Sequence, residues 1–212
     1  MPAKYDLHLE VYPGDHVRVM EFLSGFTVAD PPANVRLTIK EAVTQIDAKA
    51  PISKLATTTV TANGGILAPQ TAILTLAAPV GKGATEIVLT TIPMTPGAVS
   101  GTVVPLAFYA GTRLTFSGGL VVTLSADVRE NLTLPVLPTS LAAQGGETAS
   151  HLHAAFFFLL LPTETAIIPV TTGPDDPASW LHDMPFMTAG GIRTTAFRGR
   201  VFARYQQITS TN

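Results

Sequence analysis

The sequence contains no cysteine, which excludes disulfides, thiolate metal sites and cysteine nucleophiles. Charged residues are also scarce: they make up 13% of the 212 residues, about half the share of an ordinary globular protein. The formal net charge is -2, so the chain has no electrostatic signature for nucleic acid or for an anionic membrane surface. Neither partner is therefore expected.

Long apolar runs are missing as well. The most apolar stretch, "AAFFFLLL" at 154–161, is far shorter than the roughly 20 residues that a membrane-spanning helix needs. A short apolar run of this kind is typical of a strand buried on both faces, or of half a subunit interface. No membrane segment is expected.

Strand patterns dominate what is present. In "YDLHLEVY" (5–12) Leu7, Leu9 and Val11 alternate with polar residues, and in "HVRVMEFL" (16–23) the alternation runs through Val17, Val19 and Glu21. This period of two is characteristic of half-buried strands. With 17 glycines and 17 prolines spread along the chain to form turns, the sequence predicts an all-β protein.

The closing stretch, "GGIRTTAFRGRVFARYQQITSTN" (190–212), has the pattern of a complete strand, which we expect to pair within the chain or with a neighbour. Its basic residues alternate with phenylalanines, an arrangement also found in proteins that bind nucleic acid. Pairing with acidic neighbours is the favoured explanation for these basic residues, which are Arg193, Arg198, Arg200 and Arg204.

A weak internal duplication lies in the middle of the chain. "LTLAAPVGKGATEIVLTTI" (74–92) superposes on "VTLSADVRENLTLPVLPTS" (122–140) with an offset of 48 residues. The identical pairs are Thr75 and Thr123, Leu76 and Leu124, Ala78 and Ala126, and Val80 and Val128. We therefore expect a compact all-β unit built from two related halves.

The duplicated region has a composition of its own, poor in charge and rich in Gly, Thr, Val and Pro, between residues 77 and 149. The segments on either side of it resemble each other in composition and carry more charged residues. We therefore predict a small antiparallel β-sandwich formed by residues 1–76 together with 150–212. A second β domain, residues 77–149, is inserted into it.

The outer segments resemble a domain of tailed-phage particles, the BppU-like N-terminal domain of upper-baseplate and tail-fibre attachment proteins. The stretches that carry this resemblance are "VYPGDHVRVMEFLSGFTVADPPANVRLTIK", "LLLPTETAIIP" and "SWLHDMPFMTAGGIRTTAFRGRVFARYQQIT". In the second stretch, the Pro-Thr-Glu-Thr segment predicts a short helical turn. The inserted region is similar to small β modules of phage virion proteins through "GATEIVLTTI" and "AGTRLTFSGGLVVTL". One departure is "LHDMPFM", where the family has a more acidic strand.

The resemblance implies a non-enzymatic structural protein of a bacteriophage particle, assembled in the host cytoplasm. Its role would be to attach or cement subunits at the tail or baseplate. The expected partners are other virion proteins, namely tail, baseplate, fibre or capsid subunits, with copies of the chain forming a symmetric ring. No cofactor is expected. The residues expected to form the core and the subunit contacts are Phe156, Phe157, Phe158, Leu159, Leu160, Val201, Phe202 and Tyr205.

Residues that could carry chemistry are few. His151 and His153 form an H-x-H pair that a strand would place on one face, which makes them weak candidates for a metal site. The pair His182–Asp183 could form an oriented base, but no serine lies in a nucleophile-elbow context. The spacing brings no two carboxylates together as glycoside hydrolysis requires. No catalytic residue is therefore predicted.

Three alternatives remain open. The protein could be a capsid decoration or cement protein with the same fold. It could also be a carbohydrate-binding receptor module, for which one Trp and four Tyr offer little aromatic surface. A hydrolase on a β scaffold would need a carboxylate pair that the sequence does not reveal.

Overall fold

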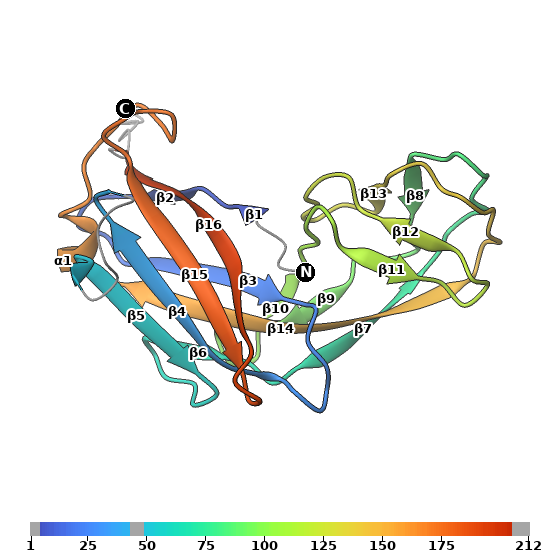
Figure 1. The fold of residues 1–212 in the computed structure, drawn as a ribbon, viewed down its shortest axis with the longest axis horizontal. Helices are drawn as coiled ribbons and strands as arrows, with labels where there is room; N and C mark the ends of the chain where they lie inside the picture. The colour runs from blue at the N-terminus through green and yellow to red at the C-terminus, as the bar shows by residue number, and fades with distance from the viewer. Residues whose placement is uncertain (1–4, 43–48, 205–212) are drawn as a thin grey trace, which may run out of the picture. The chain divides into compact units, whose positions relative to one another are not determined.

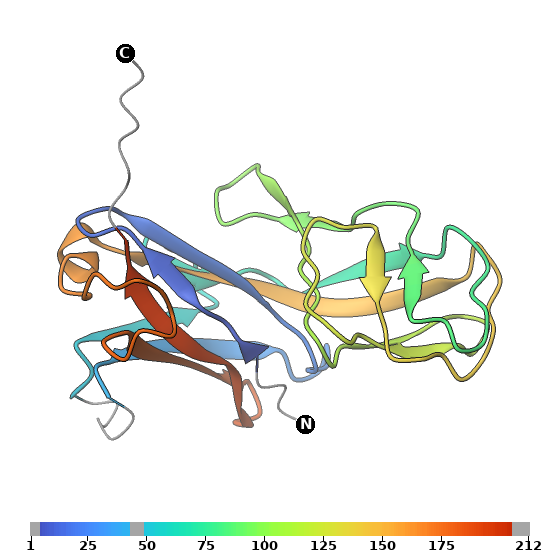
Figure 2. The same cartoon turned by 90° about the horizontal axis from the view of Figure 1, so that it is seen from above.

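The computed structural model describes residues 5–42 and 49–204. Within these residues every element except one four-residue helical turn is a β-strand, and most strand pairs are antiparallel (Figures 1 and 2). The prediction of an all-β protein is confirmed.

The chain divides into two compact units. The first, here called the repeat unit, is formed by Glu21–Pro31 and Leu67–Ala155. The second, the sandwich unit, is formed by the chain up to Met20, by Pro32–Ile66 and by the chain from Phe156 on. The predicted insertion, 77–149, lies inside the repeat unit, and its independence as a domain stays a prediction.

The larger layer of the sandwich unit is a six-stranded sheet with the order β1-β16-β15-β4-β5, in which β2 also pairs with β16 (Figure 1). Its strands are β1 (Tyr5–Asp6), β2 (Leu9–Val11), β4 (Pro32–Lys40), β5 (Ile52–Thr57), β15 (Trp180–Thr188) and β16 (Arg193–Ala203). Alternation places Val35, Leu37 and Ile39 of β4 in the core, where none of the three is accessible to solvent.

The second layer comes from a sheet with the order β3-β14-β6, made of β3 (Val17–Leu23), β14 (Thr148–Leu160) and β6 (Gly64–Ile66). Phe156 of β14 packs against Phe197 of β16, with their ring centroids 5.9 Å apart. Both side chains are fully buried. The apolar run that was predicted to form a buried strand thus packs in the core of the β-sandwich.

The closing strand β16 has partners on both sides within its own chain. It pairs antiparallel with β15 and parallel with β1 and β2, so the first strands of the chain lie beside the last one. The predicted strand is confirmed, and its partners are the two N-terminal strands and β15.

A close approach of two backbones fixes this edge of the sheet. Gly199 of β16 lies so near Leu7 that a Cβ atom at residue 199 would stand 1.9 Å from the Leu7 carbonyl oxygen. The short gap between β1 and β2 falls at Leu7 and His8, where the Leu7 amide still donates to the Arg198 carbonyl oxygen over 2.9 Å. Only a residue without a side chain allows this packing.

We therefore expect Gly199→Ala to displace the N-terminal strands and to cost about 1–3 kcal/mol of unfolding free energy. Chemical denaturation measures the loss, and faster amide exchange over residues 5–11 would locate it. Gly173→Ala is the matched control, because an added Cβ there would meet only the flexible Arg204 side chain, at 3.8 Å. Equal stability of the two variants would contradict this explanation.

The predicted helical turn is α1 (Pro162–Thr165). Glu164 accepts a hydrogen bond from the Leu161 amide over 2.7 Å and forms an ion pair with Lys54 at 2.7 Å. Thr165 is buried, and its hydroxyl donates to the Asp15 carbonyl oxygen over 2.9 Å. The turn therefore anchors the Pro-Gly-Asp turn between β2 and β3.

The repeat unit consists of short two-stranded ladders and isolated bridges. In addition to the first part of β14, its strands are β7 (Gln70–Thr75), β8 (Glu86–Val88), β9 (Met94–Pro96), β10 (Val103–Pro105), β11 (Arg113–Thr115), β12 (Val121–Thr123) and β13 (Thr133–Pro135). β7 pairs antiparallel with β14, where Leu74 lies opposite Ala149, and the equivalent strand β12 pairs antiparallel with β11, where Val122 lies opposite Leu114.

The residues repeated between the two halves occupy equivalent positions in this unit. Leu76 and Leu124 are each 1% exposed, and Val80 and Val128 are each 6% exposed. The backbone bonds correspond as well: Ala77 N to Val88 O with Ser125 N to Pro135 O, and Thr90 N to Thr75 O with Leu137 N to Thr123 O. The predicted offset of 48 holds for the first strand of each half, but the turn of the second half is one residue shorter, so the offset is 47 for β8 and β13. The two halves of the predicted duplication thus share one backbone arrangement.

The halves meet along an internal pseudo-twofold axis. β8 and β13 are the equivalent strands of the two halves, and they pair antiparallel with each other, Ile87 opposite Leu134. The bonds that flank this pair are reciprocal, Leu89 N to Leu132 O at 2.9 Å and Val136 N to Thr85 O at 2.8 Å. A duplicated sequence forms such a pair naturally, because each half presents the same strand to the other.

Candidate functional site

The two histidines proposed as metal ligands lie side by side in the interior of the repeat unit. The rings of His151 and His153 on β14 are stacked, with centroids 6.0 Å apart, and both side chains are buried. His153 Nε2 is 2.9 Å from the Thr95 hydroxyl, and its Nδ1 is 3.3 Å from the His151 carbonyl oxygen. Phe108 packs on the other side of His151, at 5.2 Å between ring centroids.

This environment favours two neutral imidazoles. Burial lowers the pKa of His151 to about 4, with a further contribution from His153, and burial also lowers the pKa of His153. Among residues 5–42 and 49–204 no group of three or more potential ligands could hold a metal ion. The two buried rings contribute to the packing of the repeat unit, and a role of the pair in metal binding stays a prediction.

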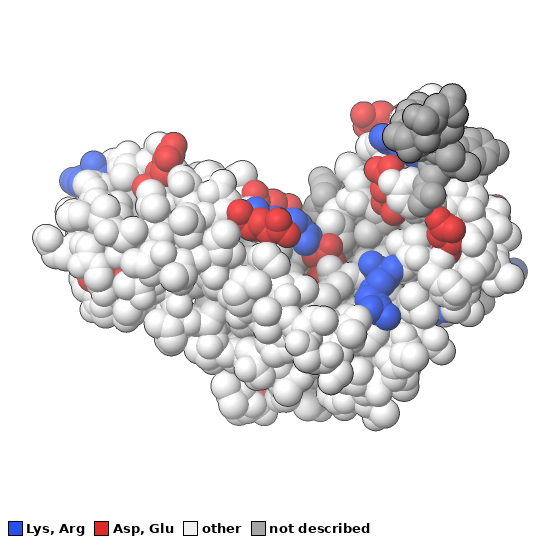
Figure 3. Space-filling view, turned by 180° about the vertical axis from the view of Figure 1, so that it is seen from behind, with Lys and Arg blue, Asp and Glu red and all other residues white. Residues whose placement is uncertain are grey.

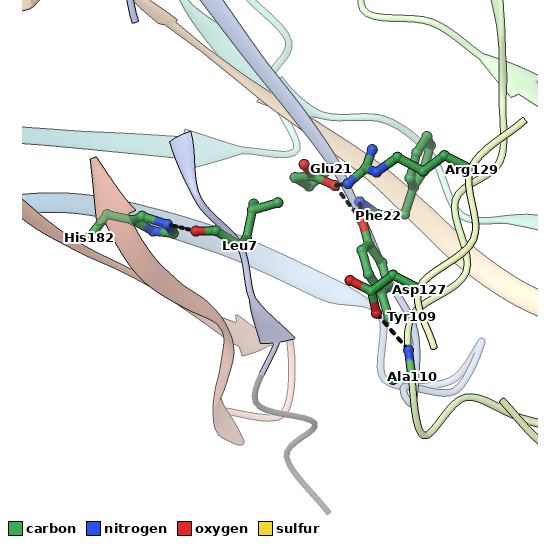
Figure 4. A network of polar contacts seen from close by, with 8 residues as sticks. All are labelled: Leu7, Glu21, Phe22, Tyr109, Ala110, Asp127, Arg129 and His182. Atoms are coloured by element: carbon green, nitrogen blue, oxygen red, sulfur yellow. Dashed lines mark hydrogen bonds and ion pairs between the residues drawn. The ribbon is translucent and has the colours of Figure 1, made fainter. Parts of the chain in front are cut away.

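The repeat unit also contains a buried ionic cluster, which was not predicted from the sequence (Figure 4). The Glu21 carboxylate accepts hydrogen bonds from the Tyr109 hydroxyl at 2.5 Å and from the Arg129 guanidinium at 2.6 Å. The Tyr109 hydroxyl in turn accepts a bond from the Phe22 amide at 3.3 Å. The Glu21 side chain is 7% exposed, whereas that of Arg129 is 47% exposed.

Burial dominates the ionisation of this cluster. It raises the pKa of the Glu21 carboxyl above its ordinary value, although Arg129 and Tyr109 act in the opposite direction. Burial, together with the charge of Glu21, raises the pKa of the Tyr109 hydroxyl well above its ordinary value. The cluster joins the segment 21–31 to the rest of the repeat unit.

The predicted base pair His182–Asp183 does not form. The two residues are neighbours on β15, so their side chains leave opposite faces of the strand. His182 Nε2 makes a short hydrogen bond to the Leu7 carbonyl oxygen instead (Figure 4). Burial lowers the pKa of His182 to about 4, so the imidazole is neutral at pH 7 and Nε2 carries its proton.

The best candidate for a binding site is a cleft of about 440 Å³ in the sandwich unit. Its residues belong to β4, β15, β16 and the segment between β1 and β2. They are His8, Lys40, Leu181, His182, Asp183, Arg198, Gly199 and Arg200. Two buried polar atoms among them, His182 Nδ1 and Asp183 Oδ1, have no hydrogen-bond partner. The volume lies in the range of small-molecule sites, about 300–1,000 Å³.

The arginines of the closing strand were predicted to pair with acidic neighbours, and one of the four does so. Arg204 lies 3.7 Å from Glu10, as predicted for a pair with an acidic neighbour. Arg193, Arg198 and Arg200 form no ion pair with any carboxylate in the described part of the chain, so the prediction was wrong for these three. Asp183 on β15 and Asp6 on β1 both lie opposite Arg198 in the strand register, and Asp183 makes no ion pair with it.

The residues predicted to form core and subunit contacts are mostly in the interior of the chain itself. Buried side chains among them are Phe156, Phe157, Phe158, Leu160, Val201 and Phe202, while Leu159 is half-buried. Tyr205 lies outside the described residues. The six buried side chains belong to the core, and a contact of any of the eight residues with another subunit stays a prediction.

Comparison with known proteins identifies no relative: no family model, no curated protein and no solved structure matches this chain. Across the described residues no helix has the length and apolar character to cross a bilayer.

Proposed function

We propose that this protein is a non-enzymatic structural component of a bacteriophage particle. In this proposal it attaches or cements neighbouring subunits at the tail or baseplate, with copies of the chain arranged in a symmetric ring. The proposal has its origin in the resemblance of the sequence to virion proteins. The observation that carries it is the duplicated architecture of the repeat unit.

The resemblance and the duplicated architecture are connected by the place of the similar sequence segments in the structure. "GATEIVLTTI" contains β8 of the first half, and "AGTRLTFSGGLVVTL" contains β11, which precedes the second half, and β12. These segments therefore belong to a compact module with internal symmetry. A chance similarity between isolated strands would not require the segments to share such a module. The buried histidines and the Glu21 cluster support the non-enzymatic part, because their polar atoms serve internal hydrogen bonds.

A protein that joins subunits needs an exposed apolar surface, and the hairpin of β9 and β10 provides one (Figure 2). One face of this hairpin carries Thr95, which is buried against His153. The opposite face carries Met94 and Val103, which are 50% and 64% exposed, together with the two prolines across from them, Pro105 and Pro96. Figure 3 shows another face, on which charged side chains gather in small groups and most of the surface is uncharged.

We expect the hairpin face to contact a neighbouring virion subunit. Met94→Asp with Val103→Asp should then reduce incorporation into purified particles at least tenfold, because charges would be buried in an apolar contact. Quantitative mass spectrometry of particle and free fractions measures this. Val60→Asp with Ile73→Asp, two other exposed apolar positions, is the matched control. Undiminished incorporation of the hairpin variant would remove the hairpin from the proposal.

A further inference from the structure

The outer face of the six-stranded sheet concentrates positive charge. Strand register places Lys40, Leu181 and Arg200 in one row across β4, β15 and β16, and Thr38, Asp183 and Arg198 in the next row. A second cleft of about 310 Å³ farther along the same strands is lined by Arg36 and Arg193. Five of the thirteen Lys and Arg residues therefore belong to one face of one sheet, in a protein whose net charge is -2.

The guanidinium groups on this face are not neutralised by the protein. Arg36, Arg193, Arg198 and Arg200 form no ion pair with a described carboxylate, and the only side-chain bond among them runs from Arg200 to the Ser179 carbonyl oxygen at 3.4 Å. A group of unpaired guanidiniums around a concave surface attracts carboxylate, sulfate or phosphate groups, which it can bind in a bidentate manner.

The base of the larger cleft has a different character. Asp183 lies on the face of β15 that carries Leu181, whereas the His182 side chain leaves the opposite face and bonds to Leu7. The buried Asp183 Oδ1 is a carboxylate oxygen and is an acceptor without a donor among the described residues. A buried acceptor needs a ligand that brings an O–H or N–H donor. A simple anion such as phosphate or sulfate offers few or none.

We propose that this cleft binds an acidic sugar unit of a polysaccharide. The anionic group of the sugar lies against Arg198 and Arg200, and one of its hydroxyl groups donates to Asp183. Leu181 supplies apolar surface for the carbon-bound hydrogens of the ring, and the second cleft with Arg36 and Arg193 accommodates the next acidic unit of the chain. This inference does not depend on the place of the protein in a particle.

A nucleic-acid ligand fits these residues less well. No Phe, Tyr or Trp side chain lines the larger cleft, and the second cleft has one, Phe186, so bases would find little stacking surface. The Asp183 carboxylate would also repel phosphate groups close to the arginines. The same carboxylate favours a ligand that combines negative charge with hydroxyl donors.

The test measures binding of the full chain to four probes at one salt concentration: polygalacturonate, dextran sulfate, neutral dextran and a single-stranded oligonucleotide. Polygalacturonate should bind best, and neutral dextran should not bind. Arg198→Gln with Arg200→Gln should weaken polygalacturonate binding at least tenfold. Arg113→Gln, an exposed arginine of the repeat unit, should leave it unchanged. Unfolding measurements on each variant show that the fold is intact.

Asp183→Asn separates hydroxyl recognition from simple charge attraction. The substitution makes the face more positive, so a surface that only attracts anions would bind polygalacturonate more tightly. The proposed site exchanges a charged acceptor for the weaker amide oxygen and should bind polygalacturonate about tenfold more weakly, while binding of dextran sulfate does not fall. Tighter binding of polygalacturonate by Asp183→Asn would overturn the proposal. So would preference for the oligonucleotide, or absence of binding to polygalacturonate.

Discussion

Replacing Arg129 by methionine is expected to lower the unfolding free energy by about 3 kcal/mol, the lower end of the range for a buried ion pair that loses one partner. The lower end applies because the guanidinium is 47% exposed, whereas the Glu21 carboxylate that it serves is buried. Among the described residues, Tyr109 is then the one remaining hydrogen-bond donor to this carboxylate. The methionine retains the apolar part of the side chain, so the change is mainly one of charge.

The pH dependence of this loss has a defined sign. Burial raises the pKa of Glu21 in the folded protein, and Arg129 counteracts this, so the substitution raises the pKa further. A carboxyl group with a raised folded-state pKa contributes stability below its unfolded-state pKa and loses it as the pH rises through the folded-state value. The difference between the variant and the wild type should therefore be smaller near pH 4 than at pH 7.

A double substitution tests whether the charge of Glu21 causes the loss. Glu21→Gln removes the charge and keeps an acceptor for Tyr109, so the pair Glu21→Gln with Arg129→Met should recover most of the lost stability. Arg113→Met, in the same unit but without an ion pair, should change stability by less than about 0.5 kcal/mol. If the double variant is no more stable than Arg129→Met, the cluster does not act as described.

Acid should destabilise both units through buried histidines. The pKa of His151 in the repeat unit and that of His182 in the sandwich unit are both lowered to about 4 by burial. A difference of one in pKa corresponds to about 1.4 kcal/mol. Each histidine should therefore cost its unit on the order of 3 kcal/mol as the pH falls from 7 to 4. The sign follows because a lowered folded-state pKa gives stability above the unfolded-state pKa, about 6.5, that disappears as the pH falls through the folded-state value.

Two substitutions separate the contributions. His151→Phe retains the aromatic contact with Phe108, and His182→Gln retains an N–H donor for the Leu7 carbonyl oxygen. Each should make the stability of its own unit less dependent on pH between 7 and 4. Chemical denaturation over this range measures the effect, and NMR titration of the imidazole resonances measures the two pKa values directly. Values near 6.5 would contradict the burial of neutral rings.

Much of the fold could be predicted from local pattern. The alternation in β2 and β3, the apolar run of β14 and the closing strand β16 all follow from a period of two, because such patterns are readable within one segment. The helical turn at Pro162 and the duplication were likewise predicted from short sequence motifs. Glu21 was placed on the buried face of its strand for the same reason.

The features that sequence did not reveal depend on residues far apart in the chain. Glu21 meets Arg129 across 108 positions, and no local pattern specifies that pairing. The parallel pairing of β1 and β2 with β16 joins the two ends of the chain and depends on the close approach at Gly199. The cleft likewise required the registers of β4, β15 and β16, which bring Lys40, Asp183 and Arg198 to one face.

The most direct test of the proposed function is immunogold labelling of purified phage particles from the culture that produces this protein, viewed by electron microscopy. We expect the label to cluster at the tail end of the particle, where attachment proteins lie. Label spread over the head would assign the protein to capsid cementing, with the same fold and a different position. Absence of label from every particle would contradict the account of a virion protein.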